Sequence, residues 1–276
     1  MMRKKILSFI FIVLFAATAA GCMSDSVNDP STGEIITYQN KYQYIDGTYV
    51  AYGTYYNDNG YVPALLLTVQ NGIVVCADFD LFDAQGNRYS QNASADTSED
   101  RSLFRTEVKS LNSALLQSQN YTQLDTGSAT GELYQKLASV LFPLLISGDT
   151  TPAAVDMALT YHASAAANAY GYYPMLSVTY SDAIITKIEF VQLDAQNNNI
   201  VNLKEYTDTY RAKNGITYQD ALAMLETIPD DSATLTKTQV TGIDKDLLST
   251  YNKLASAVSA KHQIFQSDPT SLFSSK

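Results

Sequence analysis

Cysteine and histidine, the side chains that most often carry covalent and acid–base chemistry, are scarce in this sequence of 276 residues, which has two of each. His162 and His262 lie far apart, and neither can be assembled into a hydrolytic arrangement with a serine, cysteine or aspartate. The sequence also contains no P-loop and no GxGxxG fingerprint. Asp78, Asp80 and Asp83 lack the glycine and the terminal glutamate of a calcium loop. We interpret Asp78 and Asp80 as the solvated face of a strand.

Cys22 has the sequence context of a lipid attachment site. Basic residues at positions 3–5 precede an apolar stretch at 6–20 that is too short for a comfortable membrane span. The stretch ends in Ala19-Ala20-Gly21-Cys22, which resembles the cleavage box of bacterial lipoproteins. We therefore expect cleavage before Cys22, a diacylglycerol on its thiol, and anchoring to the cell membrane on its extracytoplasmic face. The alternative is an ordinary signal peptide in which the cysteine is coincidental.

The charge balance of the sequence argues against nucleic-acid binding. The net charge is −10, and removal of residues 1–21, which hold three basic and no acidic residues, would bring it to −13. A surface this acidic repels phosphate backbones, and no basic patch reverses that repulsion. Hydrophobic residues make up 46% of the chain, which is sufficient for packed cores.

An internal duplication organises the rest of the chain. Residues 60–87 match residues 171–198 without a gap, at an offset of 111 positions, and the identities begin at Gly60/Gly171. Chance does not keep identities in phase over so long a window. We therefore predict a leader at residues 1–21, a flexible tether at 22–44, two tandem domains at 45–148 and 153–263, and a tail at 264–276.

Each predicted domain is α+β, with an antiparallel sheet and helices packed on one of its faces. In the first domain, strands at 64–69 and 73–81 are joined by Gln70-Asn71-Gly72, a strong hairpin signal, and two amphipathic helices follow. Cys76 lies within the second of these strands, where we expect a small buried side chain. We expect no intramolecular disulfide framework. In the second domain, Thr217 is a candidate N-cap with an acidic residue, Asp220, three positions later.

The order of several short motifs resembles that of the FMN-binding domain. This domain occurs in periplasmic subunits of sodium-pumping and related respiratory complexes, and as tandem copies in surface lipoproteins of Firmicutes. The resemblance covers residues 44–262. The matching pieces are Asp46-Gly47-Thr48-Tyr49, Gly60-Tyr61, Val69-Gln70-Asn71-Gly72-Ile73 and Asp83 to Gly86 in the first repeat, and Gly171-Tyr172, Gly215-Ile216-Thr217 and Val240-Thr241-Gly242 in the second.

The resemblance implies a covalent flavin. In that family a flavin transferase esterifies the last threonine of a Ser/Thr-Gly-Ala-Thr element with the phosphate of FMN, and the flavin ring then takes and gives electrons. The corresponding element here has an extra residue between its glycine and its alanine, which makes Thr130 the acceptor candidate, with Thr126, Gly127 and Ser128 beside it. In the second repeat Asp244 stands at the acceptor position, and a carboxylate cannot form this phosphoester. Alternatively, both elements are only helix starts, with Thr130 and Asp244 as N-caps.

Two hypotheses about function follow. The resemblance implies an extracytoplasmic lipoprotein that carries electrons from a membrane redox donor to an outside acceptor, with FMN on the first domain. Such a protein is a redox carrier rather than an enzyme with its own substrate. The altered acceptor elements favour the second hypothesis, a flavin-free surface lipoprotein that keeps the fold as a binding or interaction module. The 20 tyrosines could stack on a flavin or a sugar, but they also suit strand packing.

Overall fold

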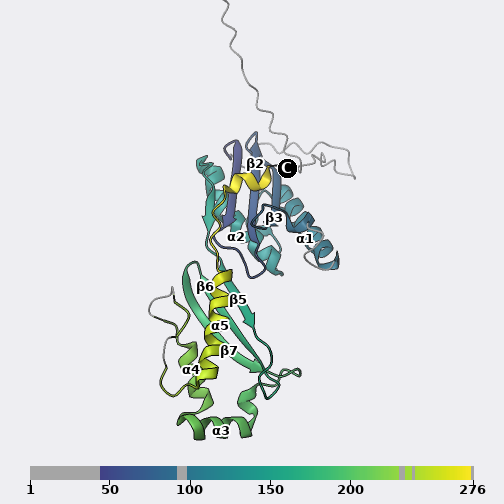
Figure 1. The fold of residues 1–276 in the computed structure, drawn as a ribbon. Coiled ribbons are helices and arrows are strands. Elements are labelled where there is room, and N and C mark those ends of the chain that lie inside the picture. Colours follow the sequence, from purple (N-terminus) through teal and green to yellow (C-terminus); the bar gives the residue numbers. More distant parts are fainter. Residues whose placement is uncertain (1–43, 92–97, 230–233, 238–239, 275–276) are drawn as a thin grey trace, which may run out of the picture.

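The computed structural model describes residues 44–91, 98–229, 234–237 and 240–274. Within these residues the chain forms two sheets, and each sheet packs against its own set of helices (Figure 1). The α+β class predicted from the sequence is confirmed. The predicted leader and nearly all of the predicted tether, Cys22 included, lie outside the described residues.

The first sheet has four strands in the order β3-β2-β1-β4. Strands β1 (Gly47–Gly53), β2 (Val62–Gln70) and β3 (Ile73–Phe82) form an antiparallel meander. The short strand β4 (Ala153–Val155) pairs with β1 in the parallel direction. The prediction of a purely antiparallel sheet is therefore wrong here, because the segment that leads out of this domain adds a parallel strand to the sheet edge.

Helices α1 (Ser98–Ser118) and α2 (Ala129–Ser147) cover one face of this sheet, and the 3₁₀ helices η1 (Tyr89–Gln91) and η2 (Tyr121–Gln123) precede them (Figure 1). Side chains alternate between the two faces of a strand, so every second residue faces the helices. The core between sheet and helices contains almost fully buried side chains from β1, β2, β3, α1 and α2: Tyr49, Ala51, Leu65, Leu67, Phe79, Leu115, Leu137, Leu141 and Leu145.

The second sheet is antiparallel in the order β5-β6-β7. It comprises β5 (Ala158–Ser164), β6 (Tyr173–Ser181) and β7 (Ile184–Leu193). After the 3₁₀ helix η3 (Ile200–Asn202) come helices α3 (Lys204–Asn214), α4 (Tyr218–Glu226) and α5 (Lys245–Lys261). Strands and helices bury a common core: Tyr161, Leu176, Val178, Phe190, Tyr210, Tyr218, Tyr251, Leu254 and Val258.

The helix starts show which signals can be recognised locally. Thr217 caps α4 as predicted: Asp220 N donates to Thr217 Oγ1 at 3.1 Å, and Thr217 N donates to Asp220 Oδ2 at 3.3 Å. Helix α3 was not predicted. Its N-cap residue, Leu203, makes no side-chain capping hydrogen bond, and its mostly polar sequence has only one buried residue, Tyr210. It therefore carries neither a cap signal nor an apolar stripe.

The hairpins β2–β3 and β6–β7 share local details. The pairing register shifts after Thr68 in the first hairpin and after Thr179 in the second. Each hairpin is followed by the same turn, in which an aspartate side chain, Asp83 or Asp194, accepts hydrogen bonds from two backbone amides and from an asparagine side chain. The aspartate oxygens replace the backbone partners that a turn leaves unsatisfied.

The other face of the first sheet is covered by the end of the chain. We call residues 263–273, which include the 3₁₀ helix η4 (Pro269–Phe273), the C-terminal strap. The strap leaves α5 and crosses over the first sheet (Figure 1). Residues 264–276 had been expected to form a tail. In the structure Phe265 and Leu272 are buried against this face, together with Tyr56, Val62, Ala64 and Phe82.

The strap also changes the environment of the strand aspartates. Asp80 is only 2% exposed and accepts a 2.5 Å hydrogen bond from Ser90 Oγ. The prediction that it lies on a solvated face is wrong, because residues 88–90 and the strap cover that face. The guanidinium of Arg88 pairs with both oxygens of Asp78 and lies 5.2 Å from the ring of Phe82 and 5.6 Å from that of Phe273, a strap residue. Burial raises the pKa of Asp80 against the opposing effect of its hydrogen bonds.

Cys76 is nearly fully buried, as expected.

We predict that Phe265→Ala lowers the free energy of unfolding by about 3 kcal/mol, because it empties a buried aromatic site between the strap and the sheet. Urea denaturation would measure the change. The control is Ile264→Ala, since the Ile264 side chain is 51% exposed and its loss should cost less than about 0.5 kcal/mol. Equal midpoints for the two variants would show that the strap does not stabilise the first sheet.

Candidate functional site

The predicted acceptor element lies at the start of helix α2, which begins at Ala129. Its N-cap is Ser128, whose Oγ accepts a 2.9 Å hydrogen bond from Gly131 N and donates to Glu107 of α1. The alternative in which Thr130 is the N-cap is therefore wrong, because Ser128, the residue inserted between the glycine and the alanine, takes that position. Thr130 instead lies in the first helical turn with a partly exposed side chain. Its hydroxyl is not used to start the helix.

Gly131 also shapes this helix start, although the sequence pattern did not single it out. A Cβ atom added there would approach the carbonyl oxygen of Asp125 to 2.6 Å, closer than any real contact. The chain can therefore turn tightly into α2 only with glycine at this position. Gly127 N donates to Asp125 Oδ1 at 3.0 Å. The side chain of Asp125 therefore stabilises the turn that precedes the helix.

Thr130 lines a pocket of about 350 Å³ in the first domain. The pocket lies between the loop that precedes β2, the end of β3, and helices η1, α1 and α2. Its lining combines aromatic, amide, hydroxyl and carboxyl groups: Asn57, Asn59, Tyr61, Leu81, Tyr89, Asp100, Leu103, Phe104, Glu107 and Thr130. Among these residues the sequence had indicated only Thr130 as an acceptor and Tyr61 as part of a motif.

Aromatic rings form part of the pocket wall. The rings of Tyr61 and Tyr89 meet edge to face at 5.4 Å, and those of Tyr89 and Phe104 at 5.2 Å. Such rings offer flat apolar surface to a planar ligand. Phe104 also packs in the core of the first domain, and nothing in the linear sequence indicates that its ring would border a pocket.

The pocket combines negatively charged side chains with the partial positive charge of a helix N-terminus. Asp100 and Glu107 supply carboxyl groups, and no Lys, Arg or His belongs to the lining. The first turn of α2, where Thr130 lies, offers the positive end of a helix dipole and backbone N–H groups. The pocket therefore suits a planar aromatic ring, and its most favourable place for an anionic group is the helix start beside Thr130.

At the start of α5, in the second domain, the N-cap residue is part of an ion pair. Asp244 caps α5 as expected, accepting from Asp246 N at 2.9 Å, and Lys213 Nζ lies 2.5 Å from its other carboxylate oxygen. The hydrogen bond from Lys213 lowers the pKa of Asp244. Nearby, the ring of Tyr206 packs edge to face against those of Tyr170 and Tyr218.

Both histidines of the protein lie where the two domains meet. The ring of His262 is stacked between Tyr55 of the first domain, at 4.2 Å, and Tyr180 of the second, at 3.9 Å. Its Nε2 lies 3.0 Å from the carbonyl oxygen of Asp182. His162 contacts Asp58 of the first domain. The sequence gave no signal of this, because the contacts join residues that lie between 80 and 207 positions apart.

Within the described ranges, no group of three or more His, Cys, Asp or Glu side chains is placed to hold a metal ion. In the same part of the chain, no helix has the length and apolar character needed to cross a membrane.

Comparison with known proteins adds little. No family model and no curated protein matches the chain. Among solved structures, the crystal structure of the CPE2226 protein from Clostridium perfringens is similar over 41% of this chain and 98% of that chain, with 21% sequence identity and a TM-score of 0.32. A similarity this low supports no conclusion about function.

We predict that stability falls as the pH is lowered through 6.5, the ordinary pKa of histidine, because burial lowers the pKa of His262 in the folded protein. The unfolded chain then binds the proton more readily, so the contribution is complete above pH 6.5 and is lost below it. Thermal unfolding of the wild type and of His262→Asn, followed between pH 7.5 and 5, would measure it. The variant should lose less stability over this range. Parallel curves would contradict the prediction.

Proposed function

We propose that this protein is a membrane-anchored extracytoplasmic lipoprotein that carries FMN on Thr130 of its first domain and passes electrons from a membrane redox donor to an outside acceptor. The observation that carries the proposal is the position of Thr130. Its side chain is partly exposed, lies in the first turn of α2, and borders a pocket with aromatic walls. An acceptor hydroxyl has to be accessible to a flavin transferase, and the attached ring needs a flat apolar surface beside it.

The covalent step would join Thr130 Oγ1 to the phosphorus of an activated FMN donor, such as a flavin dinucleotide. The nucleoside monophosphate leaves, and the hydroxyl proton passes to the transferase. The flavin ring, once attached, supplies the electron-transfer chemistry. The chain supplies the acceptor oxygen and, at the N-terminus of α2, a favourable place for the phosphoester charge.

We also propose that the two domains arose by tandem duplication. The shared register shifts after Thr68 and Thr179 and the shared turns at Asp83 and Asp194 support this, because each pair is separated by the same 111 positions as the matching sequence segments. The two copies differ at the acceptor position. A carboxylate in an ion pair with Lys213 occupies it in the second domain, which supports a flavin on the first domain alone.

A second candidate function is a flavin-free surface lipoprotein that uses the same pocket as a binding or interaction module. The observation that favours it is the negative charge of the pocket lining. Glu107 is hydrogen-bonded to Ser128, two residues before Thr130, and Asp100 lines the same pocket. Like charges oppose a phosphoester unless the helix dipole outweighs them.

The decisive experiment is expression of the mature chain in the export compartment of a host that has a flavin transferase. We expect the denatured protein to gain the mass of one FMN less one water, and Thr130→Val to lose this gain completely. Thr126→Val removes a neighbouring hydroxyl and serves as the control that keeps the flavin. An unmodified wild-type protein would reject the electron carrier and favour the binding module.

The lipid anchor is tested separately. We expect Cys22→Ser to abolish incorporation of a labelled fatty acid and to release the protein from the membrane fraction, because the thioether can form only on that sulfur. The control is Cys76→Ala, which should keep the label. Labelled Cys22→Ser protein would refute the lipoprotein assignment.

A further inference from the structure

We propose that the second domain positions the pocket loop of the first domain through Asp58, and thereby sets the affinity of the pocket for its ligand. The pocket loop is residues 54–61, which connect β1 to β2. The inference rests on the proposed function, because the pocket is the one that Thr130 lines. Asp58 is a positioning residue in this proposal, since it does not itself belong to the lining.

One side of the pocket loop forms the wall of the pocket. Asn57, Asn59 and Tyr61 all belong to the lining. They are fixed to one another, because Asn57 Oδ1 accepts from the backbone amides of Asn59 and Tyr61 at 3.0 Å each, and Asn57 N donates to Tyr61 O at 2.7 Å. Gly60, with φ at +79°, completes this tight turn. The turn therefore moves as a unit.

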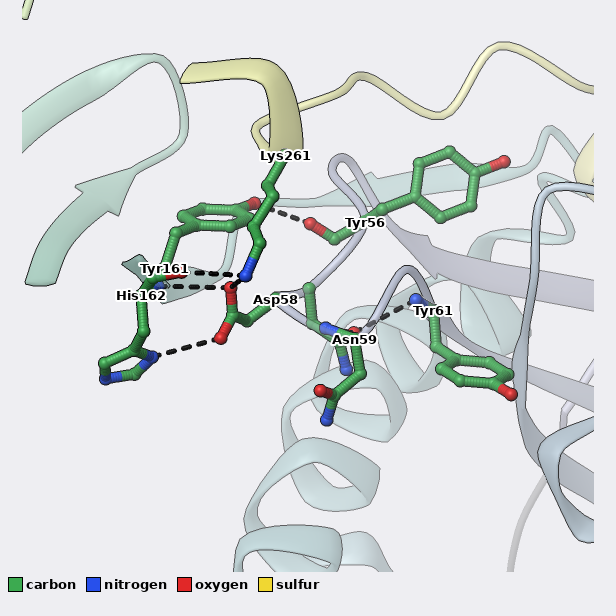
Figure 2. Close-up of polar contacts among 8 residues, drawn as sticks. Tyr56, Asp58, Asn59, Tyr61, Tyr161, His162 and Lys261 are labelled. Atoms are coloured by element: carbon green, nitrogen blue, oxygen red, sulfur yellow. Dashed lines mark hydrogen bonds and ion pairs between the residues drawn. The ribbon is translucent and has the colours of Figure 1, made fainter. Parts of the chain in front are cut away.

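The other side of the pocket loop is held by the second domain. Asp58 Oδ1 accepts from Lys261 Nζ at 2.8 Å and from His162 N at 3.1 Å, and Asp58 Oδ2 lies 3.1 Å from His162 Nδ1. Lys261 Nζ also donates to His162 O at 2.7 Å. Figure 2 shows the Asp58 carboxylate turned toward these two residues, while Asn59 and Tyr61 lie away from them. A second tie is the 2.5 Å hydrogen bond from Tyr161 Oη to Tyr56 O.

Asp58 is charged in this arrangement. Partial burial alone would raise its pKa, but the hydrogen bonds from Lys261 and His162 outweigh burial and hold the pKa below its usual value. The side chains of Asp58 and Lys261 are 24% and 41% exposed. The pair is thus partly shielded from water, and its attraction is stronger than that of a fully solvated pair.

The equivalent loop of the second domain shows that the turn itself does not require an aspartate. There Asn168 Oδ1 accepts from the amides of Tyr170 and Tyr172 at 2.9 and 3.1 Å, and Asn168 N donates to Tyr172 O at 2.8 Å. The residue in the place of Asp58 is Ala169, at the same offset of 111 positions. Asp58 is therefore not needed to fold the loop. Its carboxylate serves the contact between the domains.

Because Asp58 lies between Asn57 and Asn59 in the chain, any displacement of its backbone moves two residues of the pocket wall. The rest of the loop contacts the second domain through the stacking of Tyr55 on His262 and the hydrogen bond from Tyr161 to Tyr56. Its other backbone partners lie in β4 and in the C-terminal strap: Thr54 N donates to Val155 O, Tyr56 N to Gln263 O, and Phe265 N to Thr54 O. Loss of the Asp58 contact thus frees the half of the loop that reaches the pocket.

The test compares two lysine variants of the full mature chain, made without a flavin transferase. Lys261→Met removes the lysine contact with Asp58 and leaves the two contacts from His162 in place. Lys204→Met removes an exposed ion pair with Asp208 in the second domain, at the same 2.8 Å, and changes the net charge equally. FMN is titrated into each protein, and quenching of flavin fluorescence gives the affinity. Hydrogen exchange of residues 57–61 is followed alongside, with residues 168–172 as the internal control.

We expect Lys261→Met to bind FMN roughly fivefold more weakly, as loss of a partly shielded ion pair of about 1 kcal/mol implies. Exchange at 57–61 should rise while exchange at 168–172 stays unchanged, and Lys204→Met should match the wild type in both. If the wild type binds FMN and the two variants bind it equally, the inference is overturned and the proposed function stands.

Failure of the wild type to bind FMN at millimolar concentration would instead count against the flavin function. The exchange data then decide the positioning role on their own. Faster exchange at 57–61 in Lys261→Met, but not in Lys204→Met, supports positioning by Asp58. Equal exchange in all three proteins overturns it.

Discussion

The structure depends on one constraint, that both faces of the first sheet must be covered. Helices α1 and α2 bury one face, and the side chains of Val62, Ala64 and Phe82 on the other are too apolar to remain in water. Arg88 lies over the ring of Phe82, but the remaining apolar side chains need a segment from further along the chain to cover them. The C-terminal strap does so with Phe265 and Leu272, after the chain has completed the second domain. The first sheet is therefore complete only when the whole chain has folded.

This closure fixes how the two domains meet. The chain passes from the first domain to the second through β4 and returns through the strap. Two separate segments therefore connect the domains. The contact surface they enclose is aromatic and charged, with the His262 ring between two tyrosines and Asp58 beside Lys261 and His162. Loop 54–61 lies at this contact and at the pocket, so the second domain is physically connected to the pocket wall.

The chemistry of the pocket is a balance between shape and charge. Its aromatic edges and the accessible hydroxyl of Thr130 suit a planar ring held by a covalent link. Its carboxylates oppose an anionic link, and the start of α2 favours one. The second domain keeps the same kind of helix start, but Lys213 and Asp244 neutralise each other there. The two helix starts thus differ in their chemistry through a few side chains.

Features that depend on near neighbours could be predicted from the order of the amino acids. The Asn71-Gly72 hairpin turn, the capping box at Thr217 and the α+β class follow from periodicity and turn chemistry within a few residues. The tertiary structure decided the rest: the burial of Asp80, the packing of the strap, the choice of Ser128 as N-cap and the meeting of both histidines at the junction. Each of these depends on a partner outside the local pattern. Ser128 contacts Glu107 on the neighbouring helix, and the face that holds Asp80 is covered by a strap nearly 200 positions further along the chain. Local patterns cannot specify such contacts, because burial and pairing are set only when distant segments pack together.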